Sequence, residues 1–322
     1  MNGDHGDRPG RVLCVDGGGS KTAVLVAELE AGVEPMVKGR SLGGPANLRL
    51  TGQSQSLANL DIAIDQALNV AGFGGGPVDV AVLALAGSAQ EDVKQQVRSW
   101  AKQRQLAESL IISHDAEPVM QAGTPEGWGV ALIVGTGSIA TGINARGDSA
   151  MRGGWGHWFG DRGSGYDIGR RALTAASEAS DGMGPDTLIL ELLLQQYAIS
   201  NLRDILQRLA AETNVRKAIA AVTPLVMHAA EKGDAIATSI IDTGAASLAR
   251  TVARVASELA LEEYTLALAG GVITGSATYR QAFLASLKTA GAEPDEINIV
   301  KEPLLGCLRM AQRHMEKSGR TT

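Results

Sequence analysis

The sequence contains few aromatic residues and little cysteine. Only 3% of its 322 residues are aromatic and two are cysteines, whereas 44% are hydrophobic. We therefore expect aliphatic cores. Cys14 and Cys307, one near each end of the chain, predict neither a disulfide framework nor a metal cluster. A chain of this length is long enough for two domains of ordinary size.

Long apolar runs and blocks of basic residues are also missing. No apolar run approaches the roughly 20 residues of a membrane-spanning helix, and residues 1–10 lack the apolar segment of a signal peptide. The net charge is −6, with no block of lysine or arginine. Nucleic acid and anionic membranes are therefore not expected as partners. These absences predict a soluble, cytoplasmic protein.

Glycine, by contrast, is abundant, with 40 residues. The most informative stretch is 15–24, Val-Asp-Gly-Gly-Gly-Ser-Lys-Thr-Ala-Val, which joins two apolar runs predicted to be strands. Three successive glycines can adopt φ > 0 and expose their N–H groups, so a tight hairpin here can form an anion-binding concavity. At its mouth, the Asp16 carboxylate would repel a phosphate unless a cation lay between them. The motif indicates a phosphate loop for a Mg-nucleotide, with an ordinary glycine-rich turn as the alternative.

Two other phosphate-binding motifs fail on their context. A P-loop needs glycine directly before the lysine and a helix after it, but Ser20 precedes Lys21 and the next residues are strand-like. Residues 135–140, Gly-Thr-Gly-Ser-Ile-Ala, fit the dinucleotide fingerprint, which must open a helix. The alternation over 139–143 and the turn signal after it predict a strand instead. Residues 135–138 are therefore interpreted as a second phosphate hairpin.

The order of the predicted elements indicates one plan used twice. Strand 129–134, the glycine turn and strand 139–143 repeat the strand–turn–strand arrangement of residues 12–27. Two α/β halves, each opening with a glycine hairpin, imply a nucleotide held between them. Further strands are expected at 79–86, 110–113, 265–269 and 297–300, and helices at 56–71, 90–103, 166–180, 185–197, 202–213, 235–261, 276–290 and 304–317.

Five motifs follow one another: Asp-Gly-Gly-Gly-Ser-Lys-Thr (16–22), Gly-Thr-Gly-Ser (135–138), Gly-Gly-Trp-Gly (153–156), Gly-Asp-Arg-Gly-Ser (160–164) and Ala-Gly-Gly-Val (269–272). In this order they resemble the N-acetylglucosamine kinase / BadF-BadG-BcrA-BcrD ATPase family of the sugar kinase–Hsp70–actin superfamily. The resemblance spans about residues 11–311. It implies an α/β fold of two ribonuclease H-like (actin-like ATPase) domains with a nucleotide cleft between them. These are residues 10–116, with helix 303–318 packing back on them, and residues 117–302.

The resemblance also implies which residues hold the nucleotide. ATP and Mg²⁺ would be the cofactors, and Asp16 would hold Mg²⁺ through water. The residues expected to bind the β- and γ-phosphates of ATP are Gly18, Gly19, Ser20, Lys21 and Thr22. Those expected to clamp the phosphates from the second domain are Gly135, Thr136, Gly137 and Ser138. The adenosine motif is matched by Gly270, Gly271 and Val272.

Fewer residues carry the resemblance on the acceptor side. Asp115 matches the family's catalytic aspartate, which would accept the hydroxyl proton of the sugar; a helix N-cap is the alternative. Asn47 matches a residue that hydrogen-bonds sugar hydroxyls, with a turn asparagine as the alternative. Asp161 matches an acid that pairs with sugar hydroxyls, and its alternative is a cap of the helix that begins near Ser164.

The segment 153–164 carries both a match and a departure. Trp155, between Gly153 and Gly156, could pack against the sugar ring or its acetamide, or it could anchor a hinge. Residues 157–158 are interpreted as scaffold. The family usually has Gly-Asp-Glu-Gly-Ser, but this chain has Arg162 in place of the glutamate. The change reverses a charge beside the expected sugar site.

We therefore expect an ATP-dependent amino-sugar kinase that converts N-acetylglucosamine into N-acetylglucosamine 6-phosphate. A glucosamine kinase is the alternative. Leu-Ala-Gly-Ser (85–88) is closer to bacterial glucosamine kinases, whereas Gly-Gly-Trp-Gly-His (153–157) favours the N-acetylated substrate. The family also implies a homodimer. Two remoter alternatives are a reductive-activator ATPase, which would need paired cysteines for an iron–sulfur cluster, and a sugar sensor, which usually carries an added DNA-binding domain.

Overall fold

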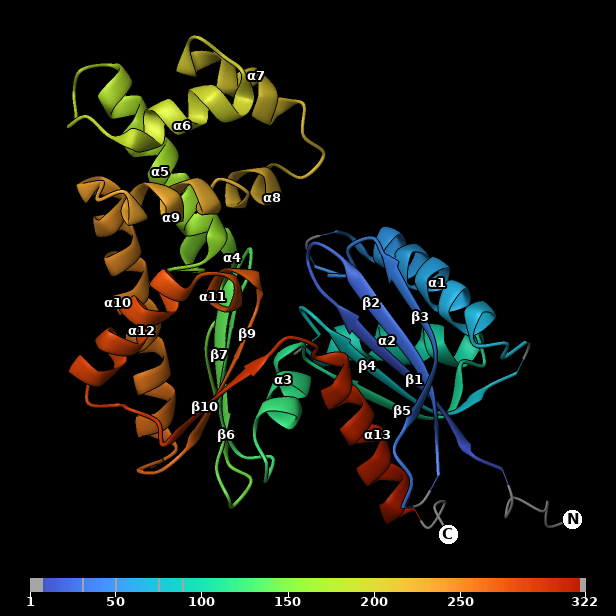
Figure 1. The fold of residues 1–322 in the computed structure, drawn as a ribbon. Coiled ribbons are helices and arrows are strands. Elements are labelled where there is room, and N and C mark those ends of the chain that lie inside the picture. Colours follow the sequence, from blue (N-terminus) through green and yellow to red (C-terminus); the bar gives the residue numbers. More distant parts are fainter. Residues whose placement is uncertain (1–7, 31, 50, 75, 89, 319–322) are drawn as a thin grey trace, which may run out of the picture. The chain divides into compact units, whose positions relative to one another are not determined.

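The computed structural model describes residues 8–30, 32–49, 51–74, 76–88 and 90–318 (Figure 1). The chain divides into two compact units: the first consists of Met1–Pro125 and Glu302–Thr322, and the second of Glu126–Lys301. Within the described part of the chain, each unit is built on its own five-stranded sheet. Across the same residues, no helix is long and apolar enough to cross a membrane.

The sheet of the first unit is an antiparallel meander followed by two parallel strands. Its strands are β1 (Gly10–Gly17), β2 (Thr22–Leu29), β3 (Met36–Gly43), β4 (Val78–Leu85) and β5 (Ala107–Ser113). Strands β1, β2 and β3 pair antiparallel, β4 pairs parallel with β1, and β5 pairs parallel with β4. The order across the sheet is β3-β2-β1-β4-β5. The carboxyl ends of β1, β4 and β5 therefore meet at one edge.

Helices cover both faces of this sheet, which explains why β1 and β4 are apolar almost throughout. The helices of this unit are α1 (Gln53–Val70), α2 (Glu91–Gln103), α3 (Ala116–Gly123) and α13 (Leu304–Lys317). Alternate residues of β1 point to opposite faces. Leu13 and Val15 pack with α1 and α2, whereas Val12 and Cys14 pack with α13.

Helix α3 belongs to the first unit, whereas the family resemblance implied a second domain from residue 117 onwards. It packs closely against α13. A Cβ at Gly306 would overlap the carbonyl oxygen of Pro118, so only glycine allows this approach. The boundary between the units therefore falls after Pro125. Helix α13 also packs on β1 and β4, so the end of the chain completes the first unit.

The sheet of the second unit repeats the topology of the first. Its strands are β6 (Gly129–Val134), β7 (Ser138–Ile143), β8 (Ser149–Gly153), β9 (Thr265–Ala269) and β10 (Glu296–Val300). Strands β6, β7 and β8 form the antiparallel meander, β9 pairs parallel with β6, and β10 pairs parallel with β9. Taken from the β8 edge, the order β8-β7-β6-β9-β10 matches that of the first sheet strand for strand. The duplication expected from the two glycine hairpins is confirmed.

The helices of the second unit share one core, which is mostly aliphatic but also buries Tyr264, Tyr279 and Phe283. They are α4 (Gly156–Phe159), α5 (Gly165–Ser180), α6 (Leu188–Tyr197), η1 (Leu202–Asp204), α7 (Ile205–Ala210), α8 (Val215–Ala220), α9 (Thr223–Glu231), α10 (Ala235–Glu258), α11 (Gly271–Gly275) and α12 (Ala277–Thr289). Side-chain caps fix where several begin: Ser164 caps α5, Thr187 caps α6, Asp234 caps α10 and Ser276 caps α12. Helix α10 packs against α12 and against β6, β7 and β8.

Several elements were not predicted from the sequence. Strands β3 and β8 lie at the edges of their sheets and expose much of their surface, so they lack the apolar run by which the inner strands were found. Helices α8 and α9 were also missed, and α9 begins with Pro224 in its first turn, a position that proline tolerates. The helix predicted at 202–213 is the short η1 followed by α7, which ends at Ala210.

Candidate functional site

The first glycine hairpin joins β1 to β2. The N–H of Gly18 donates to the carbonyl oxygen of Lys21 at 2.9 Å, which closes the turn. None of Gly17, Gly18 and Gly19 has φ in the left-handed region, so the expectation of positive φ is wrong here. At Gly17 the requirement is space, because a Cβ would lie 2.5 Å from the side chain of Leu85. The glycines allow close packing of the hairpin rather than an unusual backbone conformation.

Two other segments of the first unit meet this hairpin. The N–H of Ala46 donates to the carbonyl oxygen of Gly18 at 3.0 Å, and the N–H of Ala86 donates to that of Gly17 at 2.8 Å. The buried hydroxyl of Thr22 donates to the carbonyl oxygen of Gly44 at 2.7 Å. The loop after β3 and the end of β4 are thus fixed beside the first hairpin.

Asn47 follows that loop and is buried, with 9% of its surface exposed. Its Oδ1 accepts the N–H of Arg49 at 3.1 Å, as in an Asx turn. A Cβ at Gly87 would lie 2.9 Å from the same oxygen, which places Asn47 against the end of β4. The turn role that the sequence left open is therefore present, and Asn47 also lies close to the hairpin.

Asp115 follows β5, at the sheet edge where β1 delivers Asp16. It occupies the N-cap position of α3. Within the described residues of this helix, no backbone N–H donates a capping hydrogen bond to its carboxylate. The N-cap alternative therefore holds for its position and not for its side chain. The carboxylate remains available for other partners.

The two carboxylates influence each other's protons. Burial raises the pKa of Asp16 to about 7, the charge of Asp115 contributes to the increase, and Lys21 opposes it. Burial also raises the pKa of Asp115, whereas a hydrogen bond from the backbone N–H of Asp115 itself lowers it. A negative charge on Asp115 therefore favours the protonated form of Asp16. The pair is an electronegative site short of positive charge.

This donor set fits a magnesium ion held together with phosphates. Mg²⁺ prefers oxygen ligands and usually binds through one or two carboxylates, several waters and substrate phosphates. Among the described residues, no group of three or more histidine, cysteine, aspartate or glutamate side chains could hold a metal by itself. Asp16 and Asp115 supply the oxygen donors and the negative charge that such an ion needs.

His114, beside Asp115, was not identified from the sequence. Its Nδ1 is buried with no hydrogen-bond partner among the described residues. Burial lowers the pKa of His114, and Lys94 lowers it further, so the ring is neutral at pH 7. A buried ring nitrogen of this kind usually has a partner. A histidine directly before the candidate base was the only signal the sequence offered.

The second hairpin, residues 135–138, joins β6 to β7, as the sequence predicted. The N–H of Gly135 donates to the carbonyl oxygen of Gly137 at 2.9 Å. The residues that follow form strand β7 and not a helix, so the dinucleotide fingerprint is excluded. A Cβ at Gly137 would lie 3.0 Å from both carboxylate oxygens of Asp161, which shows how closely that side chain packs on the hairpin.

Asp161 is held against the second hairpin. It is 5% exposed, has φ of 52°, and accepts the N–H of Ser138 at 3.2 Å. Burial raises its pKa, which the Ser138 N–H, Arg216 and His157 each lower. The side chain that caps α5 is that of Ser164, which accepts the N–H of Asp167, so the helix-cap alternative for Asp161 is wrong.

The adenosine motif packs directly on the same hairpin. Gly270 has φ of 93°, and a Cβ there would lie 2.5 Å from the carbonyl group of Val134 and 2.9 Å from the nitrogen of Gly135. Both its conformation and its surroundings therefore require glycine. Gly271 and Val272 begin α11, and the Val272 side chain contacts the first turn of α5.

The start of α5 also contacts the second hairpin. The N–H of Gly165 donates to the carbonyl oxygen of Gly135 at 2.8 Å, and the N–H of Tyr166 donates to that of Thr136 at 3.2 Å. The hydroxyl of Ser138 donates to the carbonyl oxygen of Arg162 at 3.0 Å. Together with the Gly154 N–H bond to Ser138, these contacts bring four of the five motifs together at one hairpin.

The tryptophan loop begins beside this hairpin and ends at the surface. The N–H of Gly154 donates to the carbonyl oxygen of Ser138 at 3.1 Å, while Gly153, Gly154 and Gly156 all have positive φ. Trp155 is 76% exposed. Trp158, interpreted as scaffold from the sequence, is 79% exposed.

His157 packs between the rings of Trp158 and Tyr166, with centroids 4.6 and 5.3 Å away. Its Nδ1 has no hydrogen-bond partner within the described residues. Burial and Arg216 lower its pKa, against the opposing charge of Asp161. His157 is thus a polar neighbour of Asp161 as well as a packing residue.

Known proteins resemble this chain over most of its length. The model of the BadF/BadG/BcrA/BcrD ATPase family matches residues 13–304. An N-acetylmuramic acid/N-acetylglucosamine kinase of Clostridium acetobutylicum is 31% identical over 264 residues, which are 81% of this chain and 85% of the relative. An N-acetyl-D-glucosamine kinase of Dictyostelium discoideum is 30% identical over 236 residues, 71% of this chain and 74% of the relative.

A solved structure shows the same fold. It is that of a candidate N-acetylglucosamine kinase from Chromobacterium violaceum, which is 21% identical to this chain. The two structures superpose with a TM-score of 0.72, over 93% of this chain and 98% of the other. The two sheets of identical topology are therefore the paired α/β domains of this fold.

Proposed function

This chain belongs to the BadF/BadG/BcrA/BcrD ATPase family, and we propose that it is an ATP-dependent kinase of N-acetylglucosamine. It would transfer the γ-phosphoryl group of ATP to the 6-hydroxyl of the sugar. The names of the two curated relatives support this acceptor over glucosamine. The observation that carries the proposal is the uncapped Asp115 carboxylate beside Asp16 and the first glycine hairpin.

In this proposal Asp115 is the general base. Its carboxylate accepts the hydroxyl proton while the sugar oxygen attacks phosphorus, and a positioned base of this kind contributes about 10²–10⁴-fold. A pKa raised by burial suits the role, because it makes the carboxylate a better proton acceptor. Neutral His114 beside it adds no competing positive charge.

The glycine hairpins would hold the nucleotide. Phosphoryl transfer depends mainly on positioning and on neutralising charge, and backbone N–H groups at such turns suit both tasks. Asp16 would hold Mg²⁺ through water, and the ion would neutralise the phosphates when bound. The residues proposed for the β- and γ-phosphates are Gly18, Gly19, Ser20, Lys21 and Thr22, those for the phosphate clamp Gly135, Thr136, Gly137 and Ser138, and those for adenosine Gly270, Gly271 and Val272.

The sugar contacts are proposed separately. Asn47 would hydrogen-bond sugar hydroxyls, and Trp155, between Gly153 and Gly156, offers an exposed indole on which a sugar ring can pack. Asp161 is proposed to act on the sugar side as well, although one of its oxygens already accepts the Ser138 N–H. We further propose that the protein is cytoplasmic. We also propose that it is a homodimer, which light scattering of the purified protein would test.

The first experiment is ADP release from Mg-ATP with N-acetylglucosamine, N-acetylmuramic acid, glucosamine or glucose as acceptor. We expect turnover with N-acetylglucosamine. Asp115→Asn should lower kcat at least about 10²-fold with KM nearly unchanged. Asp242→Asn, a matched change at an exposed residue of α10, should leave both constants unchanged. Turnover with none of the sugars would refute the kinase, and near-normal kcat in Asp115→Asn would refute the base.

A further inference from the structure

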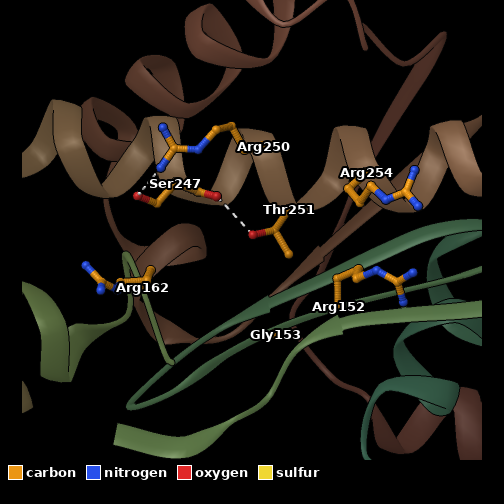
Figure 2. A pocket seen from close by; sticks show the side chains of 7 residues that line it. All are labelled: Arg152, Gly153, Arg162, Ser247, Arg250, Thr251 and Arg254. Carbon is orange, nitrogen blue, oxygen red and sulfur yellow. Dashed lines mark hydrogen bonds between the residues drawn. The ribbon is translucent and has the colours of Figure 1, made fainter. Parts of the chain in front are cut away.

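The second unit contains a hollow of about 340 Å³ to which the proposed reaction assigns no ligand (Figure 2). This volume lies at the lower end of the range for small-molecule sites. It lies between the edge strand β8, the loop before α5 and helix α10. Among the described residues its lining is Arg152, Gly153, Arg162, Ser247, Arg250, Thr251 and Arg254.

Helix α10 presents a polar stripe to this hollow. Four of the lining residues follow the i, i+3, i+4, i+7 spacing that puts side chains on one face of a helix: Ser247, Arg250, Thr251 and Arg254. Helix α10 packs against β7 and β8. A polar stripe on a helix is usually exposed to solvent. Here the stripe lines a hollow together with Arg152 and Arg162, which come from other elements.

The positive charge of the hollow is partly compensated at one end. Figure 2 shows the guanidinium groups of Arg152 and Arg254 near each other at one side, and those of Arg162 and Arg250 at the other. Glu258 forms ion pairs with Arg152 and, at 3.6 Å, with Arg254. Within the described chain, no carboxylate lies at ion-pair distance from Arg162 or Arg250. The free positive charge therefore gathers at that end.

The hydrogen-bond donors left in the hollow are those of the arginines. The hydroxyl of Ser247 donates to the carbonyl oxygen of Thr243 at 2.9 Å, and that of Thr251 donates to the carbonyl oxygen of Ser247 at 2.9 Å. Arg250 directs one N–H to the Ser247 hydroxyl at 3.2 Å and keeps its other donors. The recognition chemistry is thus cationic, which selects a charged ligand over a neutral sugar.

We propose that this hollow binds a small phosphorylated molecule, with the phosphate held by Arg162 and Arg250. The planar fork of guanidinium matches phosphate oxygens in pairs, and a concave surface of one charge concentrates the opposite ion. The arginine that replaces the family's usual glutamate thus supplies half of the phosphate clamp. The hollow shares Gly153 and Arg162 with the surroundings of the second glycine hairpin, but the proposal does not depend on the proposed kinase activity.

Calorimetric titration of the full chain tests the proposal. The probes are inorganic phosphate, N-acetylglucosamine 6-phosphate and citrate, with Mg²⁺ and a non-hydrolysable ATP analogue present to occupy any nucleotide site. We expect both phosphate probes to bind, more weakly as salt is raised. The double variant R162Q/R250Q should weaken them at least tenfold; both positions are exposed, so the fold should survive.

The matched control is Arg146→Gln. Arg146 is an exposed arginine of the same unit that pairs with Asp148 outside the hollow, so the change removes one positive charge without touching the site. Its phosphate affinity should stay within twofold of the parent. Tighter binding of N-acetylglucosamine 6-phosphate than of inorganic phosphate supports a phosphomonoester, and the reverse supports the free ion.

Three results would overturn the proposal. They are no phosphate binding at millimolar concentration, equal affinity in R162Q/R250Q and the parent, and citrate binding as tightly as phosphate. Because the readout is binding, each of these leaves the result of the kinase assay standing. Absence of turnover in that assay would equally leave this titration valid.

Discussion

Asp16→Asn should stabilise the ligand-free protein above pH 7, although it removes a residue proposed to hold Mg²⁺. Burial, together with the charge of Asp115, raises the pKa of Asp16 from its ordinary value of 3.8 to about 7. At about 1.4 kcal/mol per pKa unit, the ionised carboxylate costs the folded state at most about 4 kcal/mol. Asp16 is only half-buried, so solvent screening reduces this. We expect about 1–3 kcal/mol.

The sign follows from where the proton binds more tightly. Between about pH 4 and pH 7 the folded state holds the Asp16 proton and the unfolded chain releases it. The contribution of Asp16 to the free energy of unfolding therefore falls as the pH rises through this window and is constant outside it. Asparagine does not titrate, so the variant lacks this fall. Its advantage over the parent should be small at pH 4 and largest at pH 8.

Urea unfolding of the parent and the variant at several pH values, with EDTA present, measures this difference. Asp242→Asn is the control, because Asp242 is exposed on α10 and its removal should give a profile parallel to that of the parent. Parallel profiles for Asp16→Asn and the parent would refute the reasoning. They would mean that folding does not raise the pKa of Asp16.

Two glycines give sharp predictions of a different kind. Gly270→Ala forces a Cβ against the strand before the second hairpin at a positive φ, so it should lose about 1–3 kcal/mol of stability and weaken ATP binding. Gly271→Ala, where a Cβ has open space, should not lower the stability; equal losses of stability in both variants would refute the packing argument. Gly306→Ala should lower the unfolding midpoint because its Cβ meets Pro118, whereas Gly74→Ala, which meets nothing, should not. Thermal unfolding and nucleotide titration measure these effects.

The inner parts of both sheets were predictable because their signals are local. An apolar run, an acid, a row of glycines and a second apolar run specify a hairpin wherever they occur. The same motif led to the wrong prediction that its glycines adopt positive φ. Gly17 is required by Leu85, which lies 68 residues away in the sequence and packs against the hairpin only after folding. The local pattern predicted the hairpin, but the reason for glycine at position 17 lies in tertiary packing.

The candidate site divides in the same way. The sequence identified Asp16, Asp115 and Asp161 as acids of interest, and these side chains do lie at the hairpins of their units. It could not show that Ser164, and not Asp161, caps α5, because both residues are suitable caps. Nor could it show that His157 lies beside Asp161, since that depends on how the turn of α4 is folded.

By itself, the sequence determined the family, the duplicated strand–turn–strand plan and the segments that carry the site. These follow from short-range periodicity and from motif order, which the chain carries before it folds. Only the tertiary structure decided that α3 joins the first unit and that Arg162 and Arg250, 88 residues apart in the sequence, line one hollow. Such contacts depend on which faces of distant elements pack together. The polar stripe of α10 became a candidate binding surface only once β8 and Arg162 were placed opposite it.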